Sequence, residues 1–186
     1  MEQIILNNKL ECPVIGIGTF MLSPAEAENS VREALKMGYH LIDTANAYVN
    51  ERAVGRGMKA SGVKREDIFL STKLWPSEYE NPNAVDETLE RLGVDYVYLL
   101  YIHQPAGNWL AGYRQLEKAY RDGKAKSIGY GIATAYAKEG ANLVITGRNL
   151  QKLQEAKEEL ERLYGVKVLP VQADVSAGAD NAATAK

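Results

Sequence analysis

Short runs of apolar and β-branched residues alternate along the chain with longer segments of helical periodicity. The runs fall at residues 15–20, 40–44, 68–73, 96–102, 125–129, 143–146 and 166–171. This alternation is typical of βα units and predicts a parallel sheet. With 186 residues, 46% of them hydrophobic, the chain is long enough to bury a sizeable core. We therefore expect an α/β protein with a parallel sheet of about seven strands.

Residues at the ends of the helical segments support this reading. Ser23 precedes Pro24 and has Glu26 three residues on, which predicts a capping box at the start of a helix that Gly38 closes. The last helical segment, residues 150–164, carries an apolar stripe. Before the first strand, the stretch "QIILNNKLECPV" resembles a hairpin, although its turn has Lys9 where a glycine would turn more easily.

Composition excludes several classes of function. The formal net charge of -2 leaves no basic field for nucleic acid. No apolar run approaches the roughly 20 residues that a membrane-spanning helix needs. Cys12 is the single cysteine, so an internal disulfide is excluded. We expect a cytoplasmic protein without nucleic-acid or membrane partners, and no metal site is expected.

Four polar residues lie at the ends of successive predicted strands. Asp43 and Tyr48 follow the second strand, Lys73 closes the third, and His103 follows the fourth. In a parallel βα array the carboxyl ends of all strands open on one face, so these side chains can converge. Each alone has a structural alternative, as a turn cap, a solvated charge or a packed rim residue. Together they predict an active site.

The four residue types suit the reduction of a carbonyl group. A phenol, with a pKa near 10, is a poor acid at neutral pH, but a neighbouring ammonium stabilises its anion and eases proton donation. Asp43 would keep Lys73 charged and in place beside Tyr48. His103 would orient or polarise a carbonyl oxygen. The expected substrate is a small carbonyl compound.

The first 129 residues resemble an aldo-keto reductase of the prokaryotic type. The motifs "GIGTF", "LIDTANAYVNE", "LSTKLW", "LGVDYVYLLYIHQP" and "GKAKSIG" occur in that family's order. The resemblance implies a (β/α) barrel of eight units. It assigns proton donation to Tyr48, the tuning of that step to Lys73 and Asp43, and substrate orientation to His103. It also places Thr19 and Phe20 near the nicotinamide of an NADP cofactor.

Residues 127–176 resemble a different family, the short-chain dehydrogenase/reductases. The stretches "IGYGIATAYAKEGANLVITGRN" and "VLPVQADVS" are similar to that family's first crossover helix, second strand and third strand. The resemblance implies a Rossmann-type fragment that binds NADPH. Gly129 and Gly131 would then approach the pyrophosphate. Further cofactor contacts would come from Arg148 to the 2′-phosphate and from Asn149 and Asp174 in the adenine pocket.

The two resemblances meet inside one predicted strand, at the triplet Ser127 to Gly129. We interpret this junction as the mark of an engineered chimera of two oxidoreductase families, with little efficient catalysis. Tyr98 and Lys9, where the first family more typically has aspartate and glycine, fit an adjusted interface. The alternative is an NADP-dependent carbonyl reductase that uses the four strand-end residues.

The chimera hypothesis sets the expected architecture. A partial TIM barrel over residues 1–129 would continue as a Rossmann fragment over 130–176, within one merged domain, before a flexible tail at 177–186. The seven strands would follow in sequence order, because both parent folds use right-handed crossovers. The sheet is either closed, open or completed by a dimer. Exposed edge strands at 15–20 and 166–171 favour a homodimer.

Overall fold

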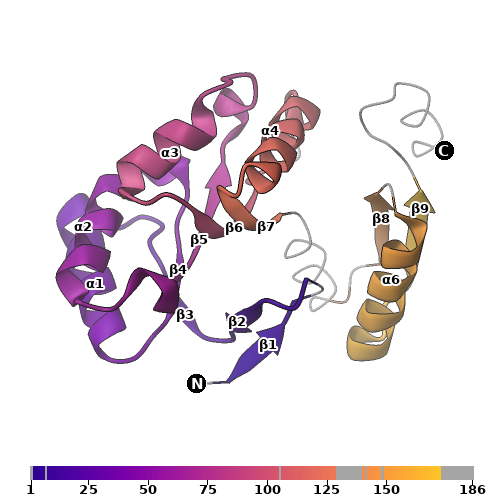
Figure 1. Ribbon diagram of the computed structural model, residues 1–186, viewed down its shortest axis with the longest axis horizontal. Helices are drawn as coiled ribbons and strands as arrows, with labels where there is room; N and C mark the ends of the chain where they lie inside the picture. The colour runs from indigo at the N-terminus through magenta and orange to yellow at the C-terminus, as the bar shows by residue number, and fades with distance from the viewer. Residues whose placement is uncertain are drawn as a thin grey trace. The chain divides into compact units, whose positions relative to one another are not determined.

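The computed structural model describes residues 2–172, except 7, 105, 129–139, 141 and 148. The chain separates into two compact units, residues 1–129 and 130–186. Figure 1 shows the helices and strands of each unit.

The first unit contains one parallel sheet and an N-terminal hairpin. Five strands lie in the order of the sequence: β3 (Gly16–Gly18), β4 (Leu41–Asp43), β5 (Phe69–Leu74), β6 (Val97–Ile102) and β7 (Ala125–Ile128). All four neighbouring pairs are parallel. The predicted hairpin is present as antiparallel β1 (Gln3–Ile5) and β2 (Glu11–Pro13), and Lys9 takes a left-handed φ of 67° in its turn.

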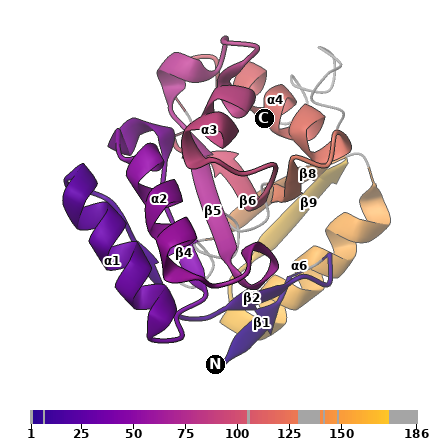
Figure 2. The ribbon, with the colours of Figure 1, turned by 60° about the vertical axis from the view of Figure 1, so that its left-hand side comes forward.

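Four helices connect the strands and lie on one side of the sheet (Figures 1 and 2). They are α1 (Pro24–Lys36), α2 (Glu51–Ser61), α3 (Ala84–Leu92) and α4 (Trp109–Arg121). The predicted capping box starts α1, where Ser23 Oγ accepts from the Glu26 amide and Glu26 accepts from the Ser23 amide. Among the residues with a described structure, no helix is long and apolar enough to cross a membrane.

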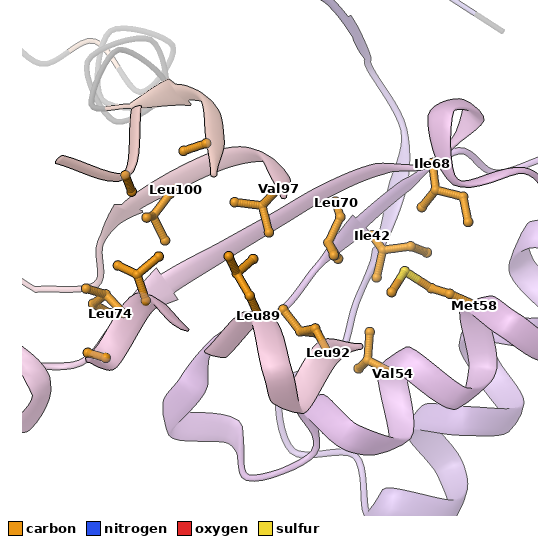
Figure 3. Packing of buried hydrophobic residues seen from close by; sticks show 14 of the residues in the cluster. Ile42, Val54, Met58, Ile68, Leu70, Leu74, Leu89, Leu92, Val97 and Leu100 are labelled. Atoms are coloured by element: carbon orange, nitrogen blue, oxygen red, sulfur yellow. The ribbon is translucent and has the colours of Figure 1, made fainter. Parts of the chain in front are cut away.

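The main core lies between these helices and the sheet. Ile42, Leu70 and Leu100, one from each of three neighbouring strands, are fully buried. Figure 3 shows their side chains among those of α2 and α3, with Val54 and Leu92 in the same layer. Every second residue of a strand points to this layer, so the alternate residues are left for the other face of the sheet.

The described part of the second unit consists of one strand, one helix and a second strand. β8 (Leu143–Gly147) pairs in parallel with β9 (Val168–Gln172), and α6 (Leu150–Tyr164) connects them. The helix has the bounds that its apolar stripe predicts. A small core forms around Leu160, Val166 and Val168.

The prediction of a single sheet of about seven strands is wrong for the described residues. They form a five-stranded parallel sheet and a separate pair, β8 and β9, besides the hairpin. β8 and β9 pair with each other over five residues, and apolar residues of α6, β8 and β9 form a core of their own. One strand–helix–strand unit is common to barrels and open sheets, and it gives no support for a Rossmann-type continuation. The five sequential strands fit a (β/α) barrel instead.

At Gly55, α2 packs closely against the end of α3, and a substitution there tests this contact. A Cβ atom at this position would lie 2.2 Å from the Leu92 carbonyl oxygen. In an exposed helix a change from glycine to alanine stabilises by about 1 kcal/mol. Here we expect Gly55→Ala to lower the free energy of unfolding by about 1–3 kcal/mol, because the helices must move apart.

Denaturant unfolding of the first unit measures this change. The exposed Ala60 of the same helix supplies the comparison, since Ala60→Gly should cost only the helix propensity of about 1 kcal/mol. A Gly55→Ala protein more stable than the parent would show that the two helices do not approach this closely.

Candidate active site

The four residues predicted to converge do so at the carboxyl ends of β4, β5 and β6. Asp43 is the last residue of β4, Lys73 lies near the end of β5, and His103 directly follows β6. Tyr48 ends a 3-10 turn, Asn46–Tyr48, that follows β4. Neighbouring parallel strands in register bring these ends to one edge of the sheet.

Lys73 is the centre of the cluster. Its Nζ atom donates to Asp43 Oδ2 at 2.5 Å, to the Thr44 carbonyl oxygen at 2.9 Å and to Tyr48 Oη at 3.3 Å. The side chain is 10% exposed. An ammonium group has three N–H donors, so the three oxygens use all of them. The charge of Lys73 is therefore directed at the phenol oxygen of Tyr48.

Asp43 is in turn held by neighbouring side chains. Its Oδ1 atom accepts from Ser71 Oγ at 2.7 Å and from Tyr101 Oη at 2.8 Å. Its other oxygen, Oδ2, is the one that Lys73 contacts. Hydrogen bonds to an ionised group are shorter and stronger than those between neutral groups. The carboxylate thus has a fixed orientation at the edge of the site.

His103 lies between two aromatic rings. Its ring is edge-on to Tyr48, at 5.6 Å between centroids, and to Trp75, at 4.7 Å. Burial, together with the nearby charge of Lys73, lowers the pKa of His103 against a smaller opposing effect of Asp43. Nδ1 is buried and has no hydrogen-bond partner among the described residues. A neutral ring with its proton on Nε2 leaves only a lone pair unsatisfied there.

The loop after β3 is fixed beside Tyr48 by buried polar contacts. Thr19 is fully buried, and its hydroxyl donates to Thr44 Oγ1 at 2.8 Å. Asn50 donates from Nδ2 to the carbonyl oxygens of Thr19, at 2.8 Å, and Leu22, at 3.0 Å. Phe20 remains 65% exposed, with its ring centroid 5.1 Å from that of Tyr48.

Comparison with known proteins shows to which family the chain belongs. The chain matches the profile of the Aldo/keto reductase family over residues 14–159. The chain belongs to the aldo/keto reductase family. It is 48% identical over 135 residues to an aldo-keto reductase of Mycobacterium sp. strain MCS, a match that covers 69% of this chain and 48% of the relative. It is 39% identical over 168 residues to glycerol 2-dehydrogenase (NADP(+)) of Saccharomyces cerevisiae, covering 89% of this chain and 50% of the relative.

Solved structures of the same family agree. The aldo/keto reductase of Brucella melitensis matches with a TM-score of 0.66 and 34% identity, covering 93% of this chain and 63% of that protein. The Bombyx mori aldo-keto reductase, solved in complex with NADP, matches with a TM-score of 0.64 and 26% identity, covering 93% of this chain and 58% of that protein. The aldo/keto reductase chain thus spans about half the length of the curated relatives it matches.

These matches correct the chimera hypothesis. The family profile runs to residue 159, well past the predicted junction at Ser127 to Gly129. The yeast relative aligns over 89% of the chain. Neither finding supports a fragment of a short-chain dehydrogenase/reductase. The hypothesis of an engineered fusion is wrong, and Tyr98 has a local packing role, with its ring stacked on Phe69 at 4.9 Å.

The sequence predicts cofactor contacts at five further residues. Gly129, Gly131, Arg148 and Asp174 lie outside the described residues. Asn149 lies in the second unit, where its carbonyl oxygen accepts from the Leu153 amide at the start of α6. Their cofactor roles stay predictions. Within the described parts of the chain, no group of three or more His, Cys, Asp or Glu is placed to hold a metal ion.

Sequence reasoning missed three residues that hold the site together: Ser71, Tyr101 and Asn50. The sequence gives a partial signal for Ser71, which lies two residues before Lys73 on one strand, so both side chains share a face. It gives none for Tyr101, because only the sheet register places this residue beside Lys73. Asn50 had no signal either, because its partners are a hydroxyl and two carbonyl oxygens of a loop distant in the sequence.

The lowered pKa of His103 gives a titration test. The protein has two histidines, His40 and His103, so NMR signals of the rings can be assigned with His40→Gln. We expect His103 to take up its second proton below pH 6.5, because burial and the charge of Lys73 oppose it. A His103 signal that titrates at or above pH 6.5 would contradict this.

The lowered pKa of His103 also predicts how the stability of the protein changes with pH. The unfolded chain binds this proton at a higher pH than the folded protein does, so the unfolded state holds more protons below pH 6.5. His103 should therefore make the free energy of unfolding fall as the pH drops through this range. Replacing it by glutamine should flatten that part of the stability profile.

Proposed function

We propose that the chain is a carbonyl reductase that uses NADPH, with Tyr48 as the proton donor. The observation that carries this proposal is the position of Lys73, whose ammonium contacts both Asp43 and the hydroxyl of Tyr48. An ammonium directed at a phenol oxygen favours the phenolate that remains after proton donation. The NADP named for a yeast relative and for the silkworm structure supports the choice of cofactor.

The surroundings of Tyr48 fit a planar, uncharged ring. Phe20, Met21 and Val49 are 65%, 84% and 86% exposed, and Phe20 lies next to the ring of Tyr48. Phe20 thus gives the site an exposed, apolar rim beside Tyr48. Such a rim suits the nicotinamide end of the cofactor and a small carbonyl substrate, while the few polar groups fix their orientation. A bound reduced nicotinamide would supply the hydride for the carbonyl carbon.

The residues of the chain supply the proton and the charge stabilisation. Tyr48 Oη transfers its proton to the carbonyl oxygen as negative charge develops there. Lys73, held by Asp43, stabilises the phenolate of Tyr48 that results. A neutral His103 with its proton on Nε2 donates a hydrogen bond to the same carbonyl oxygen and orients it. The product is an alcohol, and the phenol regains its proton from solvent.

Tyr48→Phe tests the proposal without loss of the ring. We expect NADPH-dependent reduction of small aldehydes and ketones to fall about 100-fold to 10,000-fold, the usual contribution of a positioned acid. Tyr120 is half-exposed on α4, and Tyr120→Phe serves as the matched control with an unchanged rate. Consumption of NADPH, followed by its absorbance, measures turnover.

Cofactor binding is measured separately by NADPH fluorescence. We expect the affinity to be the same in the parent and in Tyr48→Phe, because the lost hydroxyl acts on the proton. Equal turnover in the parent and Tyr48→Phe would remove Tyr48 from the reaction. A parent protein with no NADPH-dependent turnover would refute the proposed function itself.

A further inference from the structure

Two tyrosines flank the ammonium group of Lys73. The Nζ atom lies 5.0 Å from the ring centroid of Tyr48 and 5.2 Å from that of Tyr101. Their hydroxyl groups make opposite kinds of contact. Tyr48 Oη accepts a hydrogen bond from Lys73 at 3.3 Å, whereas Tyr101 Oη donates one to Asp43 Oδ1 at 2.8 Å.

We propose that Tyr101 is a positioning residue of this site, whose hydroxyl holds the carboxylate of Asp43 so that its other oxygen faces Lys73. The proposal rests on the proposed reductase function and adds a residue to it. Tyr101 acts through Asp43 and Lys73, and it contacts neither substrate nor cofactor in this role.

The sheet register explains how Tyr101 reaches Asp43. On β5, Lys73 is paired with Tyr101 of β6, and Ser71 is paired with Asp43 of β4. Ser71 and Lys73 are two residues apart, so their side chains lie on the same face of the strand. Three neighbouring strands therefore direct Asp43, Lys73 and Tyr101 to one place.

The two carboxylate oxygens have separate tasks. Oδ1 accepts from Ser71 and Tyr101, and Oδ2 accepts from Lys73. A carboxyl group can turn about its last side-chain bond, because that torsion has a broad energy profile. Two donors on Oδ1 oppose this rotation. Without the Tyr101 hydroxyl, one donor remains, and the orientation of Oδ2 toward Lys73 becomes less well defined.

The Tyr101 hydroxyl is placed to donate a hydrogen bond to Asp43 and not to a substrate. Burial, with the charge of Asp43 as the next cause, raises the pKa of its hydroxyl well above the usual range. Its hydrogen is also committed to Asp43. A phenol whose hydrogen is committed in this way is a steady donor to the carboxylate, which suits a positioning role.

Tyr101→Phe removes the hydroxyl and keeps the ring, so the packing and the contact of the ring face with Lys73 remain. The matched control is Tyr98→Phe, three residues away on β6. The Tyr98 hydroxyl donates to the Glu66 carbonyl oxygen at 2.8 Å, outside the cluster of Asp43 and Lys73. Circular dichroism and thermal unfolding verify that both variants are folded.

The first readout is independent of turnover. Lys73 is acylated with a limiting amount of acetic anhydride, and the rate is measured from its peptide by mass spectrometry. A Lys73 side chain that is held less firmly leaves its acceptors and reaches the reagent more often. We therefore expect about a threefold to tenfold faster acylation of Lys73 in Tyr101→Phe, a factor that corresponds to the loss of about one hydrogen bond. Tyr98→Phe should react as the parent does. Equal rates in the two variants would overturn the proposal.

The second readout is the division between kcat and KM. We expect kcat for carbonyl reduction to fall about fivefold to tenfold in Tyr101→Phe with KM unchanged, because the hydroxyl supports the proton-donating group and not substrate binding. An unchanged kcat in an active protein would overturn the proposal. If the parent shows no turnover, the proposed function fails, and the acylation rate alone decides the role of Tyr101.

Discussion

The site depends on the almost buried charge of Lys73. A charged ammonium that is 10% exposed is costly unless its hydrogen bonds are made by the protein. Three oxygens from β4 and the segment after it supply them: Asp43 Oδ2, the Thr44 carbonyl and Tyr48 Oη. This requirement ties β5 to the turn that presents Tyr48. The position of the proposed acid therefore follows from the need to satisfy one lysine.

The same strands build the core and the site on opposite faces. On β5, Leu70 and Leu74 join the apolar layer under the helices, while Ser71 and Lys73 point to the polar cluster. The two-residue period of a strand makes this separation automatic. It also links stability to function, because a shift of one residue in register would place Lys73 in the apolar layer.

Local sequence patterns predicted the helices and strands well. They predicted less well which strands pair with one another. The strands were visible as apolar runs, and the bounds of α6 followed from one apolar stripe. The convergence of Asp43, Tyr48, Lys73 and His103 followed from their places at strand ends. Ser71 and Tyr101 were missed because each looks like an ordinary strand residue until the register pairs it with a charged neighbour.

The chimera hypothesis failed for a related reason. A glycine-containing turn, an alanine-rich helix and an apolar strand obey the same local rules in many α/β proteins. The resemblance over residues 127–176 rested on such features. The family match across residues 14–159 covers both sides of the supposed junction. Local patterns could not show whether all strands belong to one sheet either, because this depends on which strand edges pair.

The most direct test of this account observes the ammonium group of Lys73 itself. In a ¹H–¹⁵N spectrum of lysine side chains, a buried ammonium with three protein acceptors exchanges its protons slowly. We expect one persistent signal that disappears in Lys73→Met and moves in Tyr48→Phe, which removes one acceptor. The absence of such a signal, or a Lys73 signal that Tyr48→Phe leaves unmoved, would contradict the central role of this lysine.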